Sequence, residues 1–461
     1  MTREAAIAAA EAAFDCGGVT EALARLVAIP SESQDPRGRA ALDSYLAEGV
    51  GPILVDLGCS LRTVANPVEG AGPLLIAERQ EGEGLPTVLS YGHGDVIRGL
   101  EDRWRAGLDP WRLTVEGDRL YGRGTADNKG QHLVNLTALK AVLETRGRLG
   151  FNLRVLIETG EEMGSTGLDA LAAAERAALA ADVLIASDGP RLAADRPTLF
   201  FGARGGVTMD LSVDLREGAH HSGNWGGVLA DPGLILAQAL ATVTDARGAI
   251  RVPEWRPDSL TNSVRAALAD IDPPEGGPAI DPDWGEPGLT PAERLFGWNS
   301  FCVLAFLCGD PARPVNAIQP SAWARCQLRF VVGTDRADVV PALRRWLDAQ
   351  GFPMVRVEAT ERNHFNATRL DPDAPWARWA ADSLERTLGR APAILPNLGG
   401  SLPNETFAGT LGLPTIWVPH SYPGCSQHAP DEHALGPVLR EGLAIMAGLW
   451  WDLGEGGAPA F

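Results

Sequence analysis

Histidine and acidic side chains follow four short apolar segments of this chain, just beyond the end of each segment. The segments are 87–91, 153–157, 182–186 and 414–418. The side chains that follow them are His93, Asp95, Glu161, Glu162, Asp188 and His428. In an open α/β sheet, ligands bind beyond the carboxyl ends of the strands, where the loops converge. Because imidazoles and carboxylates together suit zinc, the sequence predicts a metal site at one edge of a sheet.

A further acidic residue, Asp127, lies in the glycine-bracketed turn 122–130, which leads into a predicted helix over 131–145. Asp127 could simply cap this helix, and the spacing of the glycines does not match a phosphate-binding loop. A carboxylate here could instead bridge two cations, because each of its oxygens can face a different metal.

Each position also has a plain structural interpretation. His93 and Asp95 alone are typical of an exposed loop, and Asp188 is typical of an ordinary turn. Glu161 and Glu162 could be solvated charges, although adjacent residues point in different directions, so one carboxylate could bind a metal while the other contacts a water. The functional interpretation therefore depends on the whole set and its order along the chain.

Composition and charge limit the classes of protein to which the chain can belong. Its 461 residues are 45% apolar and carry a formal charge of −19, which argues against nucleic acid or an anionic membrane as a partner. Residues 1–14 lack the features of a signal peptide, and no apolar run reaches the roughly 18 residues of a membrane span. Six scattered cysteines are typical of a reducing compartment, so a cytoplasmic location is expected.

Helical and strand periodicity indicate an α/β domain interrupted by a second domain. Helices are predicted over 20–28, 38–57, 131–145, 165–180, 232–243 and 337–350, with a long helix beginning near 373 and another over 436–449. Additional strands are predicted over 207–215, 301–307, 322–332 and 354–359. Residues 252–290 are rich in proline, glycine and aspartate and show no periodicity. The interpretation is a discontinuous catalytic domain, 1–205 and 369–461, with an α+β domain inserted at 206–368.

The ordered set His-x-Asp, Asp, Glu-Glu, Asp and His-x-Pro-Asp-Glu resembles the dinuclear zinc peptidase family of carnosinase, aminoacylase, carboxypeptidase G and succinyl-diaminopimelate desuccinylase. The resemblance spans nearly the whole chain. The segments 221–227, 328–330 and 399–403 are most similar to the carnosinase-type dipeptidase branch. The resemblance implies a zinc-exopeptidase-like three-layer α/β/α catalytic domain with an inserted α+β lid that also forms a dimer.

The resemblance also implies a ligand set for two metals. His93 and Asp188 would hold one metal, Glu162 and His428 the other, and Asp127 would bridge them. Two Zn²⁺ per chain are expected, with Co²⁺ or Mn²⁺ as alternatives. In this family a cis peptide tends to follow the bridging carboxylate, which here is the bond between Asp127 and Asn128.

The remaining implied roles concern the reaction and the substrate. Glu161 would be the general base that deprotonates a metal-bridging water, and Asp95 would support His93. His221 would stabilise the oxyanion in the site of a partner subunit, which implies a homodimer. The implied substrate-binding residues are Arg329, which would bind a substrate carboxylate, Asn316, Ser401 and Gly400.

The leading functional interpretation is metal-dependent hydrolysis of an amide C–N bond in a dipeptide or an N-acyl amino acid. Members of this branch usually carry Arg-Glu before Gly-Gly-Ser, whereas this chain carries Asn397 and Leu398, so recognition of a zwitterionic dipeptide is in question. One alternative is an amidohydrolase, deacylase or deaminase that acts on a non-peptide small molecule, aromatic compounds included. Another is a catalytically silent binding protein of the same fold.

Overall fold

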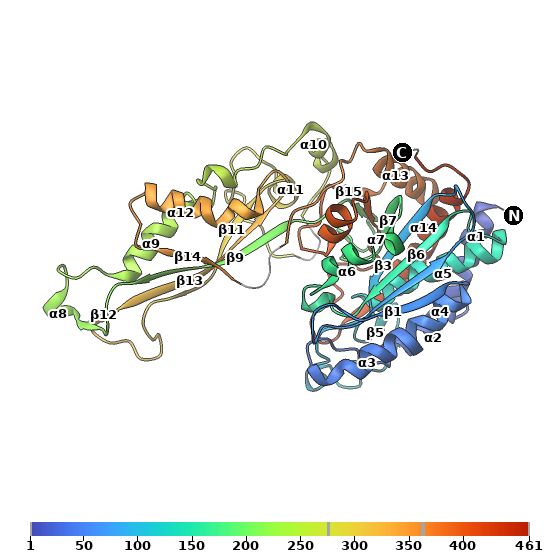
Figure 1. Cartoon of the computed structure of the whole chain (residues 1–461), viewed down its shortest axis with the longest axis horizontal. Helices are drawn as coiled ribbons and strands as arrows, with labels where there is room; N and C mark the ends of the chain where they lie inside the picture. Colours follow the sequence, from blue (N-terminus) through green and yellow to red (C-terminus); the bar gives the residue numbers. More distant parts are fainter. Residues whose placement is uncertain (1, 274–276, 361–364, 460–461) are drawn as a thin grey trace.

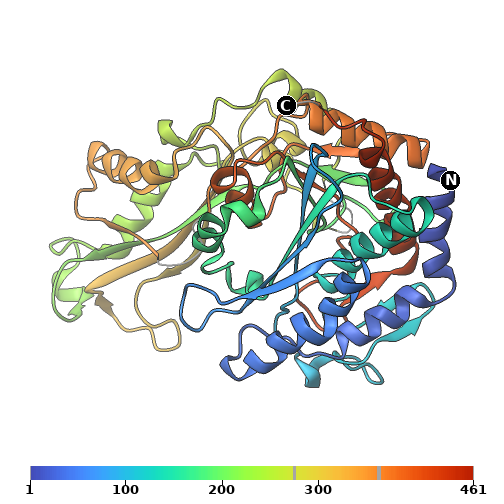
Figure 2. The ribbon, with the colours of Figure 1, turned by 45° about the vertical axis from the view of Figure 1, so that its right-hand side comes forward.

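The computed structural model describes residues 2–273, 277–360 and 365–459. The chain forms two parts that lie side by side, a larger part on the right and an elongated part on the left (Figure 1). The same division is visible in the turned view (Figure 2). No helix in the described ranges combines the length and the apolar character needed to cross a membrane.

The larger part is built around a mixed sheet of eight strands in the order β1-β2-β6-β3-β7-β16-β8-β15. Its strands are β1 (Ser60–Val64), β2 (Leu74–Arg79), β3 (Thr87–His93), β6 (Asn152–Glu158), β7 (Val183–Ala186), β8 (Thr198–Phe200), β15 (Ala393–Leu395) and β16 (Thr415–Trp417). The central strands β6, β3, β7 and β16 pair in parallel with one another. Their carboxyl ends therefore share one edge of the sheet.

Two apolar layers cover the two faces of this sheet, because successive side chains of a strand point to opposite faces. In β2, Leu75 and Ala77 join one cluster, whereas Leu74 and Ile76 join the other. The first layer contains α1 (Arg3–Asp15), α2 (Gly18–Val27), α3 (Arg39–Ser44), α4 (Gly51–Asp56), α5 (Lys129–Arg146), α13 (Pro375–Leu388) and α14 (Gly436–Gly454). The second contains α6 (Leu168–Ala174), α7 (Arg176–Leu179), α10 (Asn262–Leu268) and α11 (Pro291–Phe296). The predicted three-layer α/β/α class is confirmed.

The elongated part has its own antiparallel sheet, in the order β11-β13-β9-β14, and its own apolar cluster. Its elements are β9 (Gly205–Asp214), β11 (Ser300–Leu307), β13 (Ser321–Phe330), β14 (Arg356–Ala359), α9 (Pro232–Val243) and α12 (Val339–Ala349). At its far end lie the two-stranded pair β10 (His220–His221) and β12 (Ala317–Ile318), together with α8 (Ser222–Trp225) (Figure 1). We call this part the lid.

Most predicted elements are present, and the departures have local causes. Helix α9 begins and ends at the predicted residues. The predicted helix over 38–57 is divided into α3, a π-helical segment over Tyr45–Val50, and α4, which begins at Gly51 next to Pro52. Proline has no backbone N–H to donate to the preceding turn, and the chain accommodates this with the wider π spacing.

Several short elements have no recognisable sequence signal. Strands β1 and β2 were not predicted, and neither were α10 and α11, which are seven and six residues long. Segments of this length complete barely two helical turns, so their periodicity does not stand out. Although α10 and α11 lie within residues 206–368, their apolar side chains pack in the second cluster of the larger part.

Candidate metal centre

The loops that follow the four central strands bring the predicted ligands together. β3 ends at His93, and the other ligands lie in the loops that follow β6, β7 and β16 or in the turn before α5. They form two groups in which ligand atoms lie within 4.8 Å of one another: His93, Asp127 and Asp188, and Asp127, Glu162 and His428. Asp127 belongs to both groups. This is the geometry that a bridging carboxylate would have.

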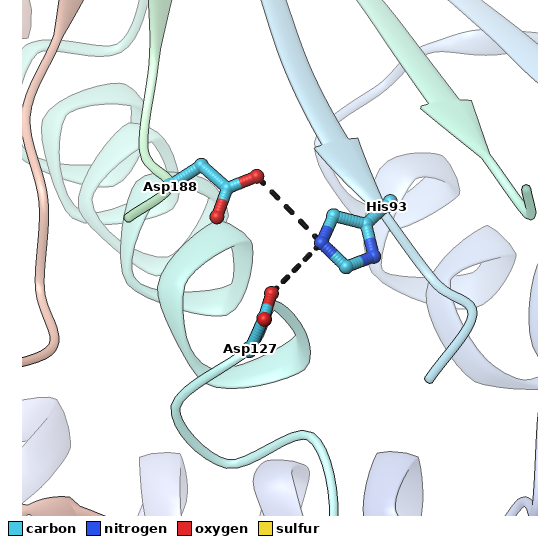
Figure 3. Close-up of side chains that lie close together, drawn as sticks. All are labelled: His93, Asp127 and Asp188. Atoms are coloured by element: carbon cyan, nitrogen blue, oxygen red, sulfur yellow. Dashed lines mark hydrogen bonds and ion pairs between the residues drawn. The ribbon is translucent and has the colours of Figure 1, made fainter. Parts of the chain in front are cut away.

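The side chains of the first group are buried and face one another (Figure 3). His93 Nε2 lies 2.9 Å from Asp127 Oδ1 and 3.6 Å from Asp188 Oδ2. On the other side of the ring, His93 Nδ1 donates to the backbone carbonyl of Asp95 at 3.0 Å. This bond leaves Nε2 facing the two carboxylates, and it fixes the ring direction as metal-binding histidines require.

The second group lies at the mouth of the site. His428 Nε2 is 3.0 Å from Asp127 Oδ2 and 3.0 Å from Glu162 Oε2. The His428 side chain is 53% exposed, whereas those of Asp127 and Glu162 are almost fully buried. The two oxygens of Asp127 thus face different imidazoles. The Asp127–Asn128 peptide bond is cis, as the sequence predicted.

The donor set fits cations. Asp188 Oδ2 is buried and has no hydrogen-bond partner among the described residues, although it points toward His93 (Figure 3). Burial raises the pKa of Asp188 to about 6 and, together with the charge of Asp127, that of Glu162 to about 7. Hydrogen bonds to Asp127 and Glu162 raise the pKa of His428 to about 10. Without cations, the site therefore holds protons to offset its crowded negative charge.

This proton occupancy predicts that metal affinity falls as the pH falls. Metal ligands must be deprotonated, so binding must displace the protons held by Glu162 and His428, and below about pH 6 by Asp188 as well. We expect the affinity for Zn²⁺ or Co²⁺ to drop about tenfold per pH unit for each proton displaced. Titration calorimetry at pH 8, 7 and 6, in buffers of different ionisation enthalpy, measures both the metal affinity and the number of protons released on binding. An affinity that does not change with pH, without proton release, would contradict this description of the site.

Glu161 differs from the ligands because its side chain enters neither group. It lines the cavity beside Asp127, Asp188 and His428, and its carboxylate has no hydrogen-bond partner among the described residues. Burial raises the pKa of Glu161 well above the ordinary value, and the nearby Asp188 and Glu162 carboxylates add to this effect. A carboxylate with a raised pKa that faces a cavity can accept and return a proton.

Asp95 connects the two sides of the centre. Its carboxylate accepts the backbone N–H groups of Glu161 and Glu162, both at 3.1 Å, and its backbone carbonyl accepts His93 Nδ1. The sequence suggested support of His93 or metal ligation for Asp95, but not the hold on the Glu161–Glu162 turn. That second contact depends on the folding of distant loops, which spacing alone does not reveal.

Two further supporting residues were missed. Glu432 is buried and accepts backbone N–H groups from Gly124, Ala126 and Asp127, and its other oxygen pairs with Arg123 at 2.8 Å. Glu432 therefore fixes the turn that carries Asp127. The sequence could have indicated Glu432 as part of the site, because it is the last residue of the motif His-Ala-Pro-Asp-Glu that begins at His428.

Asn128 provides the second missed support. Its Oδ1 accepts from the backbone N–H of His93 at 3.4 Å and lies 2.9 Å from Nδ1 of the buried His132. His132 Nε2 in turn lies 2.7 Å from the hydroxyl of Tyr45. This network joins the end of β3 to the start of α5. Neither Asn128 nor His132 showed a pattern that separates it from ordinary helix residues.

The predicted substrate residues divide into two places. Arg329, on β13, donates through Nη1 to Ser401 Oγ at 2.7 Å, and the two line a cavity of about 210 Å³. Gly400 and Ser401 also line the larger cavity that contains the metal ligands. Within one chain, Arg329 is thus linked through Ser401 to the cavity that contains the metal ligands.

His221 and Asn316 lie elsewhere. They belong to the far end of the lid, where β10 pairs with β12 and the backbone N–H of Ser222 donates to the carbonyl of Asn316 at 2.9 Å. Both residues are exposed, and this end of the lid is remote from the catalytic sheet (Figure 1). Within one chain, therefore, neither residue meets the metal ligands or Arg329.

Comparison with known proteins supports the resemblance seen in the motifs. The chain is 27% identical to the Cysteinylglycine-S-conjugate dipeptidase of Corynebacterium striatum, over 77% of this chain and 78% of that protein. It is 31% identical to the Cys-Gly metallodipeptidase DUG1 of Candida albicans, over 89% and 90% of the two chains. It is also 32% identical to the Beta-Ala-His dipeptidase of Mus musculus, but there the similarity spans 50% of this chain and 49% of that protein.

A solved structure shows the same fold over the full length. Human carnosine dipeptidase 1 superimposes with a TM-score of 0.76, at 22% identity, covering 99% of each chain. The family model described as Peptidase family M20/M25/M40 matches residues 89–452, a range that contains every ligand of the two groups. The chain belongs to peptidase family M20/M25/M40.

Proposed function

We propose that the protein is a dinuclear metallohydrolase that cleaves the C–N bond of dipeptides. The observation that carries this proposal is the position of Asp127, which is shared by two groups of potential ligands. The family and the named dipeptidase relatives favour this activity over a deacylase of non-peptide compounds and over a silent binding protein. The proposed cofactors are two Zn²⁺ per chain, with Co²⁺ or Mn²⁺ as alternatives, and the proposed location is the cytoplasm.

The proposed reaction assigns different tasks to the acidic residues. Two cations in these groups would polarise the substrate carbonyl and acidify a water. Glu161 would accept the proton of that water and pass it to the leaving nitrogen, because its carboxylate faces the cavity without a protein partner. Asp95 would act by holding the His93 ring and the Glu161–Glu162 turn in their positions relative to each other. His93, Asp188, Glu162 and His428 would hold the cations together with Asp127.

Arg329 is proposed to bind the carboxylate of the dipeptide, with Ser401 and Gly400 as neighbours. Its Nε donates to Gln327 and its Nη1 to Ser401, while Nη2 has no hydrogen-bond partner in the described part of the chain. A guanidinium with a free donor in a cavity is suited to a carboxylate.

This role predicts a difference between a dipeptide and its C-terminal amide. A hydrogen bond to a charged group is worth about 1.5–3 kcal/mol, so the amide should show a kcat/KM about 10–100-fold lower. Arg329→Ala should lower kcat/KM for the free acid to that of the amide. Arg325→Ala is the matched control, since Arg325 lies on the same strand and pairs with Asp210 at 2.8 Å. If Arg329→Ala left the ratio of kcat/KM for the free acid to that for the amide unchanged, Arg329 would not be the residue that binds the substrate carboxylate.

The domain over 206–368 is proposed to act as a lid and to join two copies of the chain. In the lid sheet, β11 is an edge strand with exposed apolar side chains at Val303, Leu304, Phe306 and Leu307. An apolar edge strand of this length is a template for pairing with another chain. Such a dimer could carry the far end of one lid, with His221 and Asn316, to the metal centre of its partner.

A reconstitution screen tests the proposed function. The metal-free protein, loaded with Zn²⁺, Co²⁺ or Mn²⁺, is assayed against dipeptides, N-acetyl and N-succinyl amino acids, and aromatic amides. Hydrolysis of dipeptides that is abolished by chelation and restored by metal is the expected result. Hydrolysis of the N-acyl or aromatic amides alone would replace the dipeptidase assignment with a deacylase or amidohydrolase.

A further inference from the structure

The metal centre opens into a cavity of about 380 Å³ that is lined by two chemically distinct sets of side chains. One set, which we call the metal end, consists of Asp127, Glu161, Asp188 and His428. The other set, which we call the apolar end, consists of Leu192, Leu295, Phe296, Leu395, Leu398 and Leu402. The volume falls within the roughly 300–1,000 Å³ typical of small-molecule sites. Because the metals would hold the scissile carbonyl, one half of the substrate must lie against this leucine-rich wall.

The wall is preformed, because hydrogen bonds fix its backbone. Asn397 Nδ2 donates to the carbonyl of Phe296 at 2.9 Å, and Arg204 Nη1 donates to the carbonyl of Leu295 at 3.1 Å. Both donors are buried. The amide of Asn397, which occupies the position of a usual family arginine, is therefore committed to holding α11 in place rather than to contacting a substrate.

Leu398 places an apolar side chain beside the metal ligands. It packs on Gly189, the residue after Asp188, where a Cβ added to the glycine would lie 3.2 Å from Leu398 Cδ2. Its backbone is fixed as well, since its N–H donates to Gly202 and its carbonyl accepts from Arg204. A usual family glutamate is thus replaced by a leucine at the boundary between the two ends of the cavity.

Arg191 is a further charged residue that lines the cavity. Its Nε donates to the carbonyl of Pro419 at 3.1 Å and its Nη1 pairs with Glu441, while its Nη2 has no partner among the described residues. The carboxylates that line the cavity all lie at the metal end. The apolar end therefore offers no anion to a substrate ammonium group, and an acidic substrate is the alternative that a test must include.

The two cavities distinguish the two halves of the substrate. The smaller cavity contains Arg329, proposed to bind the carboxylate of the amine half, and it shares with the larger cavity only Ser401. The scissile carbonyl would lie in the larger cavity, at the metals. The amine half leaves the carbonyl toward Arg329, so the acyl half is left with the apolar end.

We infer that the acyl half of the substrate carries a branched or aromatic apolar side chain, bound by the leucine-rich end of the cavity, with Leu398 as a specificity-determining residue. This inference rests on the proposed dipeptidase function and narrows its substrate class. A charged side chain on the acyl residue would lose its hydration at this end without gaining an opposite charge. An apolar one would gain burial.

The test compares two series of dipeptides on the metal-loaded protein. In the first, the N-terminal residue of X-Gly is Leu, Phe, Ala, Gly, Lys or Asp; in the second, the C-terminal residue of Gly-X is varied over the same set. Since one methylene in an apolar pocket is worth about tenfold or more, kcat/KM for Leu-Gly should exceed that for Ala-Gly by at least about tenfold, and Lys-Gly and Asp-Gly should be the poorest. The values of kcat/KM should differ less among the Gly-X dipeptides than among the X-Gly dipeptides.

Two variants of Leu398 and one control sharpen this comparison. Leu398→Ala should lower kcat/KM for Leu-Gly about tenfold and change that for Ala-Gly little. Leu398→Glu should raise the ratio of kcat/KM for Lys-Gly to that for Leu-Gly above the wild-type ratio. Leu411→Ala is the matched control, because Leu411 is also a partly buried side chain packed on the same apolar cluster but does not line the cavity. Thermal melting of each variant separates loss of folding from loss of specificity.

The outcomes distinguish this inference from the function on which it rests. Hydrolysis of Gly-Gly or Asp-Gly as fast as Leu-Gly would overturn the inference while leaving the dipeptidase function intact. A preference that appears in the Gly-X series instead would assign the apolar end to the amine half and would equally overturn it. Failure to cleave any dipeptide, with full metal content, would reject the proposed function itself.

Discussion

Glu161→Gln protein should keep its metal and lose about 10²–10⁴-fold in kcat, the contribution typical of a general base. The substitution preserves the size of the side chain and removes only its ability to take a proton. Because Glu161 belongs to neither ligand group, metal content should stay at the wild-type value. Metal analysis and steady-state kinetics on the same preparation provide the two measurements.

The matched control is Glu162→Gln, one residue away. Glu162 Oε2 lies 3.0 Å from His428 Nε2 in the second group, so this variant should bind less metal at equal metal concentration. Part of its activity should return when excess metal is added. If Glu161→Gln behaved in this way and Glu162→Gln did not, the roles of the two adjacent glutamates would have to be exchanged.

Two inactive chains should restore activity when they are mixed. In a dimer of His221→Ala with Glu161→Ala, one site would carry both lesions and the other neither, provided that each site takes His221 from its partner. Random exchange between the two parents should then recover about a quarter of the wild-type rate, because half of the dimers are mixed and each mixed dimer has one intact site. Differently tagged chains report the degree of exchange.

Each parent alone provides the baseline for this experiment, and the wild type passed through the same exchange protocol provides the upper limit. The position of His221 at the far end of the lid is the reason to expect recovery, since the residue does not approach the ligands of its own chain (Figure 1). Proven exchange without recovered activity would place His221 outside the partner's site.

The strands of the catalytic sheet could be predicted from the sequence because each one is marked by residues that are close together in the chain. The apolar segments at β3, β6, β7 and β16 are each followed by a ligand or by a loop that carries one, and this pattern revealed both the strands and the edge that they share. The antiparallel strands β1 and β2, of which β1 forms one edge of the sheet, were missed. β1 is largely exposed on both faces, so its sequence shows no alternation to detect.

The site was predictable to the extent that its residues carry functional groups in recognisable motifs. All five predicted ligands meet in the two groups. The contacts of Glu432 and Asn128, and those of Asp95 with the Glu161–Glu162 turn, were not predictable in the same way. Each joins loops that are far apart in the chain and depends on backbone N–H groups. Within one chain, Asn316 lies at the far end of the lid from Arg329, so its predicted part in substrate binding stays a prediction that depends on a second copy of the chain.

The double hold of Asp95 has a consequence for how the centre fills. One residue receives the ring of His93 through its carbonyl and fixes, through its carboxylate, the short 3-10 turn that presents both Glu161 and Glu162. A cation that orders His93 in the first group therefore also orders a ligand of the second. We expect metal binding to be cooperative, because binding of the first ion would already order part of the second group and so lower the entropic cost of binding the second ion. Protein with only one ion bound should therefore be scarce at any metal concentration.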